Sequence, residues 1–161
     1  MSDKEPETIP SIEMGIQSIR LEGFEIMEAG QKVKRQLAPD NYEFLLTFNF
    51  QLNEVDKTVD IRLHAILSNK DTKEQLALIK TLIVINVINF YEVAIKTPEG
   101  LYMLPQGVLA LFTSISVSTT RGMSVMCLAN TSFSNAFIPV FNAQTFMSQM
   151  TIVPFPETKE T

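Results

Sequence analysis

The sequence predicts an α+β fold, in which a four-stranded antiparallel sheet is followed by a long helix and a short C-terminal helix packed on one face. Strand-like segments occupy residues 15–95, and apolar residues recur at steps of three and four from about residue 105 to the mid-120s. A run of strands before a run of helices favours an antiparallel sheet backed on one side.

The strands differ in how clearly they are marked. Residues 15–30 have an extended but irregular apolar pattern, in which Gly23 suggests a bulge or a bend. Strict alternation over residues 42–52 and again over 58–67 predicts a hairpin that turns through "NEVDK". Residues 76–95 are apolar on both faces, as expected of a strand that is covered on both sides.

The stretch "SISVSTTRG" (114–122) alternates like a strand but follows the helical pattern of "LPQGVLALF". Pro105 suits the first helical position, and periodicity over five turns outweighs alternation over four residues. The sheet-facing residues of this helix are expected to be Val108, Phe112, Ile115, Thr119, Gly122 and Met126. Asn142 is a plausible N-cap for a second, short helix over residues 143–150.

The opposite face of the long helix is small and weakly polar, which allows a second helix to approach closely. It is either an oligomer interface or an ordinary solvated face. The interface candidates are Ser114, Val117, Ser118 and Arg121, and Arg121 either caps helix carbonyls or reaches across the interface.

Composition restricts the function classes. The 161 residues suit one domain, expected over residues 13–152 between tails at 1–12 and 153–161. A net charge of −5 argues against nucleic acid and anionic membrane surfaces as partners. The longest apolar stretch falls short of the ~20 residues of a membrane span. The acidic N-terminus does not resemble a signal peptide, and the single cysteine fits a cytoplasmic protein.

Catalytic and metal-binding chemistry has little support in the sequence. One histidine, His64, and one cysteine, Cys127, cannot form a closed zinc site, and the six glycines form no phosphate-binding loop. A solvated histidine and a buried, inert thiol are the better interpretations. The sequence therefore predicts a protein that is not an enzyme and has no cofactor.

Eight methionines and eleven phenylalanines provide adaptable apolar surface. They fill the core or, near loops and the terminal helix, bind apolar segments of other polypeptides. The candidate peptide-binding residues are Phe24, Ile26, Phe137, Phe141, Phe146 and Met147.

"IQSI", "FYEV", "STTRG" and "IPVFNAQTFMSQM" occur in an order that resembles the SecB-type export chaperones and their SecB-like relatives, over residues 15–150. The resemblance implies sheets paired between protomers, a dimer or tetramer, and a nucleotide-independent holdase for unfolded polypeptides. It also implies docking to the SecA translocation ATPase, although the outer hairpin face carries only Glu43 and Asp60 beside Arg62 and His64. A toxin–antitoxin-associated SecB-like chaperone with one dedicated partner is the alternative, and a small-molecule site between sheet and helix has less support.

Overall fold

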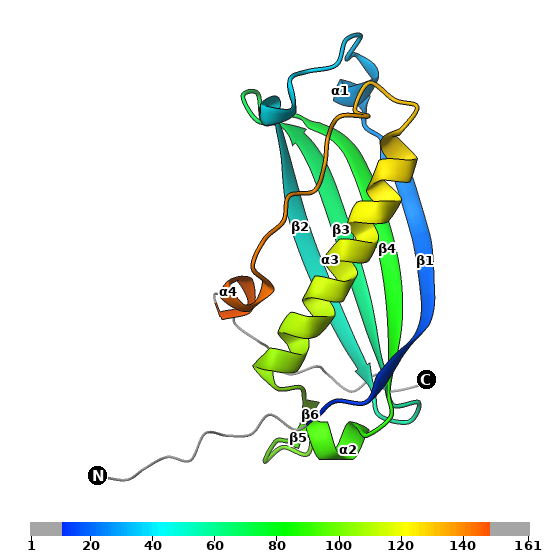
Figure 1. The fold of residues 1–161 in the computed structure, drawn as a ribbon, viewed down its shortest axis with the longest axis vertical. Helices are drawn as coiled ribbons and strands as arrows, with labels where there is room; N and C mark the ends of the chain where they lie inside the picture. The colour runs from blue at the N-terminus through cyan, green and yellow to red at the C-terminus, as the bar shows by residue number, and fades with distance from the viewer. Residues whose placement is uncertain (1–10, 149–161) are drawn as a thin grey trace, which may run out of the picture.

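Four long antiparallel strands form one sheet, and a long helix crosses one of its faces diagonally (Figure 1). The computed structural model of the protein describes residues 11–148. The strands are paired in the order β1-β4-β3-β2, with bounds β1 (Met14–Ile26), β2 (Tyr42–Asn53), β3 (Thr58–Asn69) and β4 (Gln75–Val87). The two main helices are α3 (Gln106–Leu128) and, beside β2, α4 (Ala143–Ser148). This is the predicted α+β fold.

The β2–β3 hairpin is regular along its whole length, from Tyr42 opposite Asn69 to Asn53 opposite Thr58. Its turn is held by the side chain of Asn53, whose Oδ1 accepts a hydrogen bond of 3.2 Å from the Asp56 backbone N–H. The predicted hairpin is confirmed, because alternation fixes which face of each strand is buried and therefore fixes the register.

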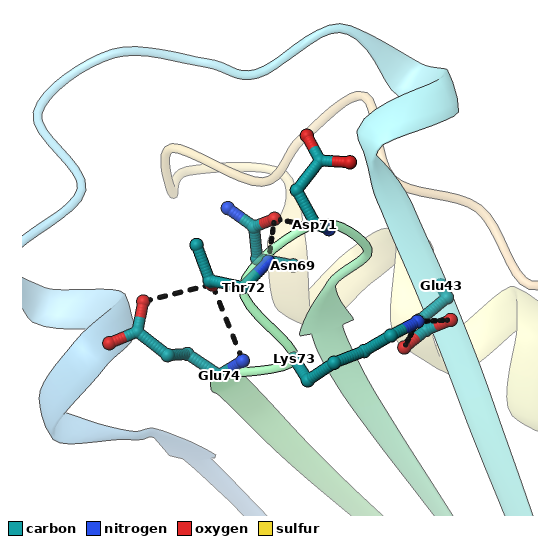
Figure 2. A network of polar contacts seen from close by, with 6 residues as sticks. All are labelled: Glu43, Asn69, Asp71, Thr72, Lys73 and Glu74. Atoms are coloured by element: carbon teal, nitrogen blue, oxygen red, sulfur yellow. Dashed lines mark hydrogen bonds and ion pairs between the residues drawn. The ribbon is translucent and has the colours of Figure 1, made fainter.

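The β3–β4 turn is built from short polar side chains (Figure 2). Asn69 Oδ1 accepts hydrogen bonds from the backbone N–H groups of Asp71, at 2.9 Å, and Thr72, at 3.2 Å. Lys73 adopts a positive φ of 61° and places its Nζ 3.0 Å from the carboxylate of Glu43 on β2. The turn therefore connects three neighbouring strands at this end of the sheet.

β1 lies at the edge beyond β4 and is less regular. Its pairing with β4 shifts register between Ile16 and Ser18 and again between Leu21 and Gly23, so the bulge expected at Gly23 is confirmed. The connection to β2 contains α1 (Glu28–Gln31) and the 3-10 turn η1 (Pro39–Asn41).

The strand expected over residues 76–95 is too long, because β4 ends at Val87. Just beyond the end of β4, the side chain of Asn89 bonds to the start of the described chain. Its Oδ1 accepts a hydrogen bond of 2.8 Å from the Glu13 backbone N–H, and its Nδ2 donates one of 2.8 Å to the Ser11 carbonyl. These bonds hold the start of the described chain against the end of β4. The chain then forms α2 (Phe90–Val93) and a small ribbon of β5 (Ile95–Lys96) and β6 (Tyr102–Met103).

The ambiguous stretch 114–122 is helical, as predicted, and Val108 and Phe112 are buried against the sheet as expected, but further along α3 the buried face differs from the expected one. Met126 is 79% exposed, whereas Thr113, Ser116, Thr120 and Ser124 are fully buried. Burial of these hydroxyls is tolerated because each has a partner; for example, Ser116 Oγ donates to the Phe112 carbonyl at 2.8 Å. A hydropathy pattern does not predict this buried face, because it counts serine and threonine as polar even where their hydroxyls are hydrogen-bonded inside the protein.

The core lies between α3 and the sheet in two clusters. One contains Phe112 and Phe90, and the other contains Phe133 and Leu63. Because each of these four side chains is at most 1% exposed, α3 and the loop after it are held firmly against β3 and β4. The expected tails at 1–12 and 153–161 lie outside the described residues, apart from residues 11 and 12.

Candidate functional site

The six candidate peptide-binding residues fall at two places instead of one. Phe24, 37% exposed, and half-buried Ile26 lie on β1, at one edge of the sheet. Phe137, 56% exposed, and half-buried Phe141 and Phe146 lie near β2, at the opposite edge. Strands β3 and β4 separate the two groups, so they do not line one groove. The side chain of Met147 is outside the described part of the structure.

An aromatic cluster joins β2 to the C-terminal part of the described chain. The rings of Phe48 and Phe50 stack with centroids 6.0 Å apart, and Phe146 of α4 lies 5.3 Å from Phe48. Phe141 meets Phe146 edge-on at 5.4 Å. Phe48 is half-buried and packs against both core clusters as well as against Phe146. The contact between Phe48 and Phe146 could not be predicted from the sequence, because alternation shows which face of β2 a residue lies on but not which segment covers that face.

Arg121 joins α3 to the segment between α3 and α4, which runs beside β2 (Figure 1). Its Nε donates to the Ile138 carbonyl at 2.8 Å and its Nη2 to the Pro139 carbonyl at 2.9 Å. These acceptors lie outside the helices, so the bonds are not the expected helix cap. The guanidinium instead fixes the backbone that flanks the exposed ring of Phe137.

An open hollow of about 410 Å³ lies between the first turns of α3 and the start of α4. Gly107, Ala110, Leu111 and Ser114 form one wall, and residues 141–144 form the other. Small residues on α3 leave this space open, and Phe141 gives it an apolar side. The hollow has room for one bulky side chain of a bound polypeptide.

The two edges of the sheet are protected differently. β1 has two register shifts and three charged residues, Arg20, Glu22 and Glu25. β2 pairs with β3 without any shift and has no charge or proline over residues 44–53. Charges, prolines and bulges are the usual devices that prevent an edge strand from pairing with another chain. β2 is therefore the edge that is open to strand addition.

Arg121 is the only charged residue of α3, and its guanidinium bonds to the carbonyls of the following loop. Ser114 and Ser118 lie on the outward, exposed face of this helix, together with Leu111, Val125 and Met126. Val117 does not: it is only 2% exposed and packs in the core against the sheet, so it is no candidate for an interface. The neighbouring row on β1, Ile16, Ile19, Leu21 and Phe24, is 37–52% exposed.

The reactive side chains are apart. His64 is on the outer face of β3, across from Thr47 and Lys80, whereas Cys127 is on α3, which covers the other face. Burial raises the pKa of the Cys127 thiol, which disfavours the nucleophilic thiolate. Within residues 11–148, no group of three or more potential ligand side chains is placed to bind a metal, and no helix is long and apolar enough to cross a membrane.

The outer face of the sheet carries charges of both signs. Arg62 Nε lies 3.8 Å from the Glu22 carboxylate, and His64 and Lys80 are paired across β3 and β4. This face is not the acidic surface that docking to SecA would require by resemblance.

No protein-family model and no curated protein matches the chain. A solved structure with some similarity is the SecB-like chaperone of Mycobacterium tuberculosis in complex with a ChAD peptide from an antitoxin. The match has a TM-score of 0.39 and 14% sequence identity, and it covers 80% of this chain and 90% of that chain. A likeness at this level says nothing about what this chain binds, so the site is interpreted from its own residues.

Proposed function

We propose that the protein is an ATP-independent chaperone of the cytoplasm that binds non-native polypeptides in extended form. The observation that carries the proposal is the open edge of β2, which lies beside half-buried Phe48, exposed Phe137 and the hollow near α4. An added strand gains backbone hydrogen bonds from the edge, and its alternate side chains meet the aromatic surface. Backbone recognition of this kind tolerates many sequences, as a holdase requires.

The test introduces charge at the edge without disturbing the fold. Thr47 and Asn49 are exposed on the outer face of β2, opposite His64 and Arg62, so the change Thr47→Glu/Asn49→Glu places carboxylates next to basic partners. We expect the wild-type protein to delay aggregation of chemically unfolded citrate synthase without nucleotide, and the variant to lose this activity.

A matched control adds the same charge elsewhere. Gln31 and Gln75 are exposed and lie away from β2, so the variant Gln31→Glu/Gln75→Glu should keep the wild-type activity. Equal activity of the two double variants, or wild-type protein that does not slow aggregation, would refute the proposal.

A single dedicated partner is the second candidate, and the hollow beside α4 favours it. A site with room for one bulky side chain suits an anchor residue of a particular segment, such as part of an antitoxin. Affinity purification separates the two functions, because a dedicated chaperone returns one abundant protein and a general holdase returns many.

We further propose that a second copy of the chain covers the outward face of α3 and the neighbouring apolar row on β1. A helix face with small residues, whose one charged side chain bonds within its own chain, allows close helix packing, and Ser114 lies within this face. Light scattering should give a dimer or tetramer for the wild type and a smaller species for Ser114→Glu. Gln75→Glu is the charge-matched control, and a wild-type monomer would contradict assembly.

A further inference from the structure

The end of the molecule that carries α2 has a second apolar surface, which the β2 edge does not include. Four large apolar side chains there are strongly exposed: Val55 at 90%, Ile88 at 60%, Tyr91 at 55% and Ile95 at 59%. They come from the β2–β3 turn, the end of β4, α2 and β5, which meet at this end (Figure 1). We call these four residues the α2-end patch. Grouped exposure of this kind marks interaction sites.

Ring contacts hold the patch together. Tyr91 packs edge-on against Phe90 at 5.3 Å and against Tyr102 of β6 at 5.7 Å. Lys57 Nζ, from the β2–β3 turn, lies 5.4 Å from the Tyr91 ring centre, and Lys96 Nζ lies 5.5 Å from that of Tyr102. The aromatic part of the surface is therefore already ordered, so a partner loses little entropy in fixing it.

The charges around the patch are predominantly negative. Five exposed carboxylates lie on the same segments: Glu13, Glu54, Asp56, Glu92 and Glu99. Against them stand two lysines, Lys57 and Lys96, which gives a local charge of −3. Among the described residues, none of these carboxylates takes part in an ion pair, because both lysines lie over tyrosine rings. Asp56 and Glu92 each accept one hydrogen bond from a neighbouring asparagine amide, and all five carboxylates are exposed, so their negative charges are available to a ligand.

We propose that the α2-end patch is a docking site for a polypeptide segment of a partner protein that combines aliphatic residues with lysine or arginine. Its aliphatic side chains cover the exposed apolar residues, and its cations meet the unpaired carboxylates, which fix its orientation and speed its association. An anionic membrane surface is disfavoured because the same carboxylates repel it. The site does not depend on the proposed activity at β2.

The test uses two fluorescein-labelled peptides of twelve residues, one with alternating leucine and lysine and one with glutamate in place of lysine. Fluorescence anisotropy should show binding of the lysine peptide, weaker binding of the glutamate peptide, and a loss of affinity as salt is raised. Glu54 and Glu99 serve for mutation because their side chains make no hydrogen bond or ion pair within residues 11–148. The double variant Glu54→Gln/Glu99→Gln should lower the affinity for the lysine peptide by about two- to fivefold per carboxylate removed.

Two controls place the site. Glu25→Gln/Asp40→Asn removes the same charge at the opposite end of the sheet and should leave the affinity unchanged. Phe137→Ser alters the β2 site and should also leave the affinity for the lysine peptide unchanged. Ile95→Ser alters the α2-end patch and should weaken binding of that peptide. Circular dichroism confirms that each variant is folded.

Four binding or mass results, and one vesicle result, would overturn the proposal. The binding and mass results are equal binding of the two peptides, equal effects of the two double charge variants, loss of binding in Phe137→Ser, and a lower molecular mass for Ile95→Ser, which would make the patch a contact between copies. Co-sedimentation of the wild type, but not Ile95→Ser, with phosphatidylserine vesicles would equally replace the protein partner with a membrane.

Discussion

A pair of buried threonines determines how α3 sits on the sheet, and it can be tested quantitatively. Thr81 Oγ1 on β4 and Thr120 Oγ1 on α3 are 2.7 Å apart, and both side chains are fully buried. Thr81 Oγ1 also lies 3.4 Å from the Leu63 carbonyl, which is too long for a strong hydrogen bond. The two hydroxyls therefore depend mainly on each other.

Valine has the shape of threonine, so Thr120→Val removes the hydrogen bond without leaving a cavity. The Thr81 hydroxyl then loses its best partner in a dry environment, and we expect the free energy of unfolding to fall by about 1–2 kcal/mol. The double variant Thr81→Val/Thr120→Val leaves no hydroxyl unpaired. It should cost less than the sum of the single changes, with a coupling of about 1 kcal/mol.

Urea unfolding followed by circular dichroism, at one protein concentration, measures these differences. With a slope of about 2 kcal/mol/M, Thr120→Val should lower the midpoint by about 0.5–1 M. Thr119→Val, at a half-buried position on the same helix, is the control and should change the midpoint little. The reasoning would be refuted if the loss of stability in Thr81→Val/Thr120→Val equalled the sum of the two single losses. Equal urea midpoints for Thr120→Val and Thr119→Val would also refute it.

Three further predictions follow from single residues. Gly30→Ala should destabilise the protein by about 2–3 kcal/mol, because a Cβ there would lie 2.1 Å from the Leu76 carbonyl oxygen. Gly122→Ala, on the open surface of α3, is the control and should stabilise the protein slightly, since alanine favours the helix. Thermal unfolding measures both changes. Arg121→Gln removes two hydrogen bonds to the following loop, so hydrogen exchange of residues 138–142 should accelerate while that of β3 stays unchanged. Iodoacetamide should alkylate Cys127 more slowly than a free cysteine at pH 8, with a midpoint at higher pH, because burial raises the pKa of its thiol; equal rates would contradict this.

The clearest strands and the long helix could be predicted because their signals are local. Alternation over 42–52 and 58–67 fixes the buried face and hence the hairpin register. Pro105 with the following helical period predicts the start of α3 to within one residue, since Pro105 is the N-cap and not the first helical residue. The end of β4 was missed because it depends on Asn89 bonding to Ser11 and Glu13, more than 70 residues earlier in the chain.

The candidate site was predicted only in part. Phe141 and Phe146 are in contact and Phe146 meets Phe48 of β2, whereas Phe24 and Ile26 lie on β1 at the other edge of the sheet. Val117 was expected outside and is in the core, because α3 turns its serine and threonine face to the sheet. Both errors arise from judging a side chain by its own polarity, without knowing which partners would be next to it.

The sequence by itself determined the β2–β3 hairpin, the long helix and an antiparallel sheet backed by that helix, because period and turn chemistry act between residues that are close in the chain. Only the tertiary structure decided which face of α3 is buried, which apolar side chains stay exposed and which sheet edge is unprotected. Those properties depend on contacts between segments that are distant in the chain. The energies of these contacts depend on the distances and orientations of the hydroxyls, rings and carbonyls that form them.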